Sequence, residues 1–450
     1  MSEKTLVNRV VEPVYDVEDK PPLKEAVPLG IQHVLAMFAG NITVPIIIAG
    51  ILGMTVGEKA FLIQSAMLVA GIATLVQANP IGPVGARLPV VQGTSFGFLP
   101  TCISIGKQFG LSGILGAAFI GGFFQMILGA FLKTVRRFFP PLVTGTVVLT
   151  IGLSLLPTGI KYAAGGVGAK DFGDPSNLFL AFVVLVTVIA FHQYAKGIFS
   201  AASILIGIVV GYIVAVFMGK IDFTPVMEAA WFSFPTPLKF GMTFHPTAIF
   251  AMLIMYIVTT VETVGDISGI TMGGAGREAT DRELSGGIIA DGFGSSFAAL
   301  FNALPNTSYS QNVGLVSFTG VMSRYVVTLG AIFLILSGLL PKLGAIIAVM
   351  PQAVLGGAAI VMFAMIATSG IVLLSQESLN RRNLLVIAVS LGLGLGFGSV
   401  PDALKFFPEW FKMIFAGSGI VVACLVALVL NIILPKDKSA SESENRNVNA

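Results

Sequence analysis

Two interrupted stretches decide the fold: residues 88–102 read LPVVQGTSFGFLPTC, and residues 305–320 read PNTSYSQNVGLVSFTG. Both lie among long apolar stretches, but both are short and crowded with Gly, Pro, Ser, Thr, Gln and Asn, which are poor helix formers. We therefore predict that these two places form short extended segments, which cross and pair with each other in an otherwise helical chain.

The composition is typical of a membrane protein. Of the 450 residues, 55% are hydrophobic and only 11% are charged, whereas a soluble domain has about 25% charged residues. Each apolar stretch is near the roughly 20 residues that cross a bilayer as a helix. Because a backbone in lipid must satisfy its own hydrogen bonds, we predict an all-α polytopic protein in the lipid bilayer. The net charge of +3 gives no indication of a nucleic-acid partner.

We predict about fourteen transmembrane spans. They lie near residues 28–46, 60–79, 88–105, 112–132, 140–158, 177–194, 199–219, 245–266, 285–303, 310–319, 325–341, 350–374, 383–399 and 414–434. The two interrupted stretches fall in the third and tenth spans.

The charges predict that both termini are cytoplasmic, in a protein of the cell (inner) membrane. The first 27 residues are polar and read as a tail without a cleavable signal peptide. With the N-terminus inside, every arginine falls in a tail or a cytoplasmic loop. The loop arginines are Arg87, Arg136, Arg137, Arg277, Arg282, Arg324, Arg381 and Arg382. Four lysines would lie outside: Lys59, Lys107, Lys161 and Lys342.

The chain also repeats itself. PPLVTGTVVLTIGLSLLPTGI at 140–160 aligns with PQAVLGGAAIVMFAMIATSGI at 351–371, 211 residues later. If these are spans five and twelve, each repeat has seven spans, and an odd repeat must insert upside down. Two apolar, Gly-rich helices could also resemble each other by chance. Spans three and ten are likewise seven apart, which favours the inverted repeat and a binding site between them at the bilayer midplane.

Three carboxylates lie inside predicted spans: Glu262, Asp266 and Asp291. Placing a charged side chain in a bilayer costs free energy, so such residues are functional candidates by default. Glu262 and Asp266 are four residues apart and share a helix face, and a desolvated carboxyl beside a like charge suits proton uptake and release. The alternative is that Asp266, near the predicted end of its span, or Asp291 only caps a helix or fixes a loop.

Several polar residues lie near these carboxylates along the predicted spans. His33 is beside Gln32 in the first span, and we favour an interhelical hydrogen-bond role for it over proton transfer. The amide of Gln311 offers two donors and one acceptor, which match the edge of a heterocyclic base. Phe96 can stack on a flat ligand, although a single Phe is more often packing.

Other function classes lack their motifs. No GxxxxGK[ST] pattern occurs, which argues against an ATP-driven pump. Neither a nucleophile–base pair nor a His/Cys cluster with metal-ligand spacing is visible, so we expect no enzyme, metal or cofactor.

At this point several motifs resemble one family. QNVGLVSFTG at 311–320 is similar to the signature Q-[NEP]-x-G-x4-T-[RKG] of the nucleobase–ascorbate transporter (nucleobase:cation symporter-2) family. The resemblance extends to VETVGDISG, ADGFGSSFAALFNALPNTSYSQN, QHVLAMFAGNITVP and GTSF, in the same order. It covers the chain from EDKPP to NIILP.

The resemblance implies fourteen spans as two inverted seven-span repeats, with extended segments in spans 3 and 10. The core domain would comprise spans 1–4 (28–139) and spans 8–11 (241–343). The gate domain, which usually builds a homodimer, would comprise spans 5–7 (140–240) and spans 12–14 (344–435). Residues 1–27 and 436–450 would be cytoplasmic tails.

The resemblance also assigns roles to residues. Glu262 would hold a base through paired hydrogen bonds and Gln311 would bind its other edge. Phe96 would stack on the base, and backbone groups near Ser95 and Ser310 would complete the site. Asp266, Asp291, Asn312 and His33 would be supporting residues that affect coupling and affinity.

Within the family, Ser95–Phe96 in GTSF and Gly320 after Thr319 are similar to the branch that carries xanthine and uric acid. The uracil branch normally has a His where this chain has Asp266, and Val313 departs from the commonest motif. The expected function is symport of xanthine and/or uric acid with a proton, sodium being less expected. The alternatives are a carrier of uracil or another base, and an anion carrier of the same architecture.

Overall fold

The computed structural model describes residues 13–132, 140–166, 168–415 and 419–435. Within them, eight helices are long and apolar enough to cross a membrane. They are α1 (Leu23–Ile51), α2 (Val56–Ala78), α3 (Leu99–Ala130), α5 (Pro141–Ala163), α6 (Pro175–Tyr194), α10 (Pro246–Ala275), α15 (Gln352–Leu374) and α16 (Arg381–Ser399). The chain is therefore a helical, multi-pass membrane protein, as predicted.

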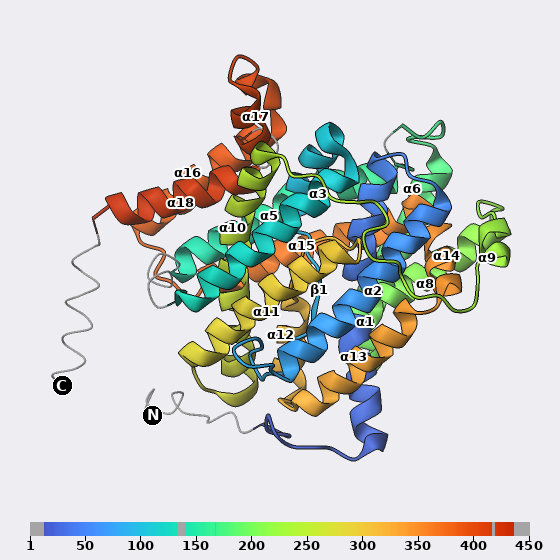
Figure 1. The fold of residues 1–450 in the computed structure, drawn as a ribbon, viewed down its shortest axis with the longest axis horizontal. Helices are drawn as coiled ribbons and strands as arrows, with labels where there is room; N and C mark the ends of the chain where they lie inside the picture. Colours follow the sequence, from blue (N-terminus) through green and yellow to red (C-terminus); the bar gives the residue numbers. More distant parts are fainter. Residues whose placement is uncertain (1–12, 133–139, 167, 416–418, 436–450) are drawn as a thin grey trace.

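Shorter elements complete the described chain (Figure 1). α13 (Arg324–Gly338) and α14 (Pro341–Ala348) are bent by 80° relative to each other, and together they qualify as a ninth span. The remaining helices are α7 (Ile198–Ala201), α8 (Ser203–Phe217), α9 (Thr224–Glu228), α11 (Asp281–Leu300), α12 (Ser310–Thr319), η2 (Pro401–Leu404), α17 (Glu409–Phe415) and α18 (Gly419–Ile433). The count of fourteen spans stays a prediction.

One predicted boundary was wrong. The eighth span does not end at Asp266, because α10 continues for nine residues to Ala275. Gly269 and Gly274 lie in this extension, where side chains of α12 and of the loop that follows it pack against them. The helical part of predicted span three and predicted span four both lie in α3, and a kink at Gly110 (φ 67°, ψ −171°) separates them, between the two predicted ranges. A left-handed residue of this kind is tolerated because glycine has no Cβ.

The two interrupted stretches pair with each other, as predicted. Strand β1 (Gln92–Thr94) is antiparallel to β2 (Asn306–Ser308), with Gly93 opposite Thr307. All six residues are buried, and β1 lies in the middle of the bundle (Figure 1). A helix follows each strand, α3 after β1 and α12 after β2. The non-helical backbone of these two strands is thus enclosed by protein, which is the condition for placing such backbone at membrane depth.

The helices pack as two groups. One contains α1, α2, α3, α10, α11 and α13, and the other contains α5, α6, α8, α15, α16 and α18. The groups touch where α1 meets α8 and α15 and where α10 meets α5 and α18. Helices α16 and α18 lie side by side at one end of the molecule (Figure 1).

The two repeated sequences are the helices α5 and α15, which pack along each other. A Cβ added at Gly152 would lie 2.7 Å from Ala367 Cβ, and one at Gly370 would lie 2.7 Å from Leu149 Cα. Glycine therefore allows these backbones to approach closely, as at many membrane helix interfaces.

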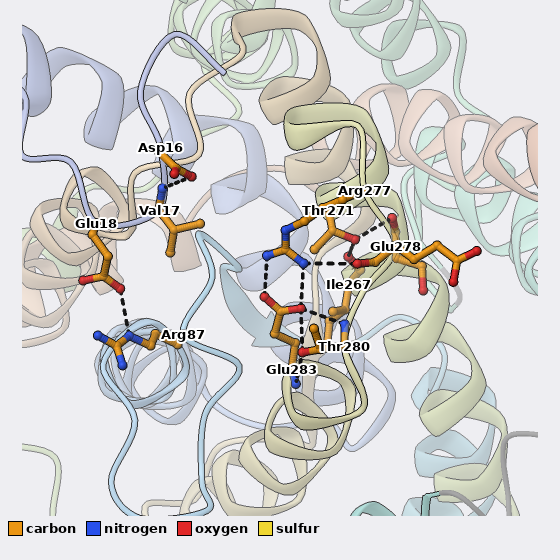
Figure 2. A network of polar contacts seen from close by, with 11 residues as sticks. Asp16, Val17, Glu18, Arg87, Ile267, Thr271, Arg277, Glu278, Thr280 and Glu283 are labelled. Atoms are coloured by element: carbon orange, nitrogen blue, oxygen red, sulfur yellow. Dashed lines mark hydrogen bonds and ion pairs between the residues drawn. The ribbon is translucent and has the colours of Figure 1, made fainter. Parts of the chain in front are cut away.

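The segment before α1 is fixed to the loop between α12 and α13. Val14 N donates to Gly320 O at 2.8 Å, and Met322 N donates to Tyr15 O at 2.8 Å. Glu18 forms ion pairs of 2.8 Å with Arg87 and with Arg324. Figure 2 shows Glu18 with Arg87, and beside them Arg277 with Glu283 at the turn between α10 and α11. Three of the predicted loop arginines, Arg87, Arg277 and Arg324, thus lie beside the N-terminal segment; Arg136 and Arg137 lie outside the described residues.

Candidate functional site

Hydrogen bonds on both sides of the place where β1 and β2 cross hold the two strands together. Ser95 N donates to Pro305 O at 3.0 Å, and Tyr309 N donates to Val91 O at 3.0 Å. The hydroxyl of Tyr309 donates to Thr94 O at 2.6 Å, and Thr94 N donates to Oδ1 of Asn41 in α1 at 2.9 Å. These bonds fix the positions at which α3 and α12 begin.

Asp291 lies beneath this crossing on α11 and is fully buried. Its carboxylate accepts hydrogen bonds from four residues: Gln92 Nε2, Thr263 Oγ1, Thr307 Oγ1 and both the backbone and the hydroxyl of Ser308. These donors belong to β1, α10 and β2. Asp291 therefore ties both strands to α10 and α11, and the structure gives this predicted site residue a scaffold position.

All five residues predicted to bind substrate line one small cavity at the strand ends. They are Ser95, Phe96, Glu262, Ser310 and Gln311. Its volume is about 20 Å³, which is far below the few hundred Å³ typical of a ligand pocket. Phe96 closes one side, with its ring edge-on to Phe363 of α15 at 5.1 Å. This inner pocket is therefore narrow in the present conformation.

A cavity of about 390 Å³ adjoins the inner pocket and shares Glu262, Ser310 and Gln311 with it. α10, α12 and α15 provide most of its wall, so it lies between the two helix groups. It continues along α12 to Ser317, toward the end where Gly320 holds the N-terminal segment. This cavity has the size of a small-molecule pocket.

Glu262 and Asp266 both line this larger cavity from α10. Oε2 of Glu262 and Oδ2 of Asp266 are buried and have no hydrogen-bond partner among the described residues. In the part of the chain that the structure describes, no lysine or arginine lines either cavity. Gly97 lies beside Glu262, since a Cβ built there would be 3.6 Å from its Oε2, an ordinary van der Waals contact. The arrangement can therefore offer hydrogen bonds to a polar ligand and can exchange a proton.

His33 and Asn312 support α12 from the side of α1. Nδ2 of Asn312 lies 2.9 Å from Nδ1 of His33 and 3.2 Å from its carbonyl oxygen. Both residues are buried, and neither lines the inner pocket or the larger cavity. The interhelical hydrogen bond expected for His33 is therefore present, one residue from Gln311.

Sequence reasoning missed several residues of the scaffold. Tyr309 fastens the two strands, and Thr263 joins Asp291 to α10. A polar residue between a strand and a helix start could have indicated Tyr309. Thr263 gives no such signal, because a threonine hydroxyl in a helix commonly bonds its own helix, as Thr263 does with Thr259 O at 3.0 Å.

Comparisons with known proteins agree with this fold and these motifs. Residues 24–403 match the model of a permease family. The xanthine permease of Bacillus subtilis is 40% identical over 410 residues, covering 90% of this chain and 92% of that protein. The uric acid transporter UacT of Escherichia coli is 39% identical over 411 residues, covering 90% of this chain and 85% of that protein.

Solved structures with the same fold are more distant in sequence. The transmembrane domain of the cyanobacterial bicarbonate transporter BicA has a TM-score of 0.56 at 14% identity, covering 93% of this chain and all of that one (100%). Murine Slc26a9, an anion transporter in the inward-facing state, has a TM-score of 0.59 at 16% identity, covering 92% and 69%. The family match, the identities and the motifs agree, and this chain belongs to the nucleobase–ascorbate transporter family of permeases.

Proposed function

We propose that this chain is a proton-coupled symporter that carries oxidised purine bases, xanthine and/or uric acid, into the cell. The observation that carries the proposal is the inner pocket, where Glu262, Gln311 and Phe96 meet beside a cavity of about 390 Å³. The names of the relatives, a xanthine permease and a uric acid transporter, support the choice of substrate.

In this proposal the base binds between the strand ends and α10. Gln311 reads one edge of the base with its amide, and Glu262 pairs with an N–H/C=O edge. A protonated glutamic acid has one donor and one acceptor, so proton and base complete the site together. Phe96 stacks on the ring, and backbone groups near Ser95 and Ser310 supply the remaining bonds. Release on the cytoplasmic side follows when Glu262 loses its proton.

The remaining site residues act indirectly in the proposal. Asp266, one helical turn from Glu262, tunes the proton affinity of that carboxyl. Asp291 keeps the strands in place, and the pair Asn312–His33 keeps Gln311 in position. Since the pocket is too small for a base in this conformation, binding requires the two helix groups to separate.

We also propose fourteen spans in two inverted repeats, with the core and gate domains at the boundaries given above. The contacts support this, because several of them have a counterpart seven spans later. α2 packs on α13 as the second half of α3 packs on α11, and α6 packs on α8 as α16 packs on α18. The boundary at 343/344 lies within α14. A homodimer through the gate domain and cytoplasmic termini complete the proposal.

An anion carrier of the same architecture is the alternative from a different substrate class, since both structural neighbours described above transport anions. A carboxylate pair at the cavity wall, without a cationic lining residue, counts against it. A carrier of uracil or another base is the alternative within the family.

The test is uptake of labelled xanthine and labelled uric acid in cells that lack their own carriers. We expect uptake of at least one of them, inhibited by a protonophore and unaffected by removing sodium. Competition by a panel of bases and anions separates the alternatives: strong competition by uracil or bicarbonate, with none by xanthine or urate, would overturn the proposal.

A further inference from the structure

A second cavity, of about 370 Å³, lies on the other side of α12. Its wall comes mainly from α1, α7, the start of α8 and α12, and His192 of α6 and Met365 of α15 also line it. It shares Gln311, Gly314 and Met365 with the larger cavity described above. The two cavities therefore have a common wall, and Gln311 lines both of them as well as the inner pocket.

Gln32 of α1 is the unusual residue of this second cavity. Its side chain is more than nine-tenths buried, with 6% of the residue exposed, and it lines the cavity. Among the described residues it has no hydrogen-bond partner, whereas its neighbour His33 is bonded to Asn312 at 2.9 Å. Buried amides normally have partners, so the open amide of Gln32 points to a ligand that is polar and uncharged.

We propose that this second cavity is a subsite for the transported base between the inner pocket and the N-terminal face, with Gln32 as its polar anchor. The inference rests on the proposed function. The amide of Gln32 has two donors and an acceptor, the set needed for an N–H/C=O edge, and the cavity has the size of a small-molecule pocket.

The position of Gln311 gives the subsite its role. From Gln311 the second cavity follows α12 to Phe318, near Gly320, whose carbonyl accepts from Val14. A base leaving the inner pocket can keep its bond to Gln311 while its other edge reaches Gln32. The space beside Gly314 is open, because a Cβ built there would meet nothing within 4 Å. Gln32 is therefore a positioning group for release rather than part of the inner site.

The test uses two single cysteines and a small methanethiosulfonate reagent on the purified full-length protein. Ala201→Cys reports on the second cavity alone, and Ser317→Cys is the matched control in the first cavity alone. The native Cys102 and Cys424 are buried, and the unsubstituted protein gives the background rate. The rate of modification is measured at increasing xanthine concentration, with Gln32 intact and with Gln32→Ala.

We expect xanthine to protect both cysteines when Gln32 is intact. Gln32→Ala should raise the xanthine concentration for half-protection at Ala201→Cys by about fivefold or more, the effect of losing one hydrogen bond. At Ser317→Cys the change should stay below about twofold, which also shows that the variant is folded. Protection of Ser317→Cys alone, or an equal shift at both cysteines, would overturn the subsite. If neither xanthine nor urate protects either cysteine, the proposed function itself fails.

Discussion

Asp291 and Glu262 are two carboxylates on the packed helices α11 and α10, yet their surroundings are opposite. Asp291 accepts hydrogen bonds from four residues, including both strands of the crossing. Glu262 has a buried oxygen without a partner among the described residues and lies at a cavity. A membrane carboxylate whose acceptors are filled by protein serves the scaffold, whereas one left open at a cavity is available to a ligand or a proton.

The largest effect, on stability, should come from removing Asp291, the carboxylate whose oxygens accept hydrogen bonds from the protein. Asp291→Ala leaves several buried donors unpaired at about 1–3 kcal/mol each, so we expect a loss of at least about 3 kcal/mol of stability. Thermal unfolding of the purified protein, followed by size-exclusion chromatography, measures it. Glu262→Ala is the matched control and should abolish uptake while its unfolding temperature stays close to that of the natural protein. Equal stability of Asp291→Ala and Glu262→Ala would show that Asp291 does not serve the scaffold more than Glu262 does.

A smaller effect should come from Gln311, the residue that lines the inner pocket and both larger cavities. Gln311→Ala removes a bond to the base and should weaken xanthine binding by about 1–3 kcal/mol, roughly 5- to 150-fold. Equilibrium binding of labelled xanthine measures this. Gln376→Ala is the control, since Gln376 lines the larger cavity but not the inner pocket, and it should change the affinity by less than about threefold. Unchanged affinity in well-expressed Gln311→Ala protein would remove Gln311 from the site.

The smallest effect concerns a carboxylate outside the membrane. Hydrogen bonds from Arg324 and Arg87 lower the pKa of Glu18 from 4.5 to about 2. Its contribution to stability is therefore complete above pH 4.5 and is lost as the pH falls toward 2. Because the side chain is half exposed, Glu18→Gln should cost less than about 1 kcal/mol at neutral pH.

The pH dependence of the unfolding temperature tests the direction of the pKa shift of Glu18. The difference in unfolding temperature between Glu18→Gln and the natural protein should shrink between pH 4.5 and pH 2. A difference as large as that of Asp291→Ala would mean that this ion pair, and not the strand crossing, holds the core together.

The sequence predicted the strand crossing because its signal is local. Gly, Pro and polar residues interrupt two apolar stretches at corresponding positions, and only a crossing inside the protein can satisfy such backbone. It also brought together the five residues of the inner pocket, through the motifs that carry the family resemblance. The narrowness of that pocket and the neighbouring cavities depend on how the helix groups pack, which no local pattern encodes.

The features that the sequence analysis predicted wrongly or missed also depend on how distant parts of the chain pack. α10 was predicted to end at Asp266, but it continues through a stretch in which Gly269 and Gly274 make room for α12 and for Met322 in the loop that follows it. The partners of Asp291 come from β1, α10 and β2, so only tertiary structure could separate its role from that of Glu262. α14 was not predicted as a separate helix, because its eight residues follow α13 after a bend of 80°.

We propose that Glu262 both binds the base and couples transport of the base to transport of a proton. Glu262→Gln keeps the hydrogen-bonding shape but cannot titrate, so it should still exchange labelled xanthine across sealed vesicles. The decisive measurement is accumulation of xanthine in those vesicles against an imposed pH gradient. We predict that Glu262→Gln exchanges xanthine but does not concentrate it at any gradient. Accumulation by Glu262→Gln with the proton dependence of the natural protein would contradict the claim and leave the coupling to another group.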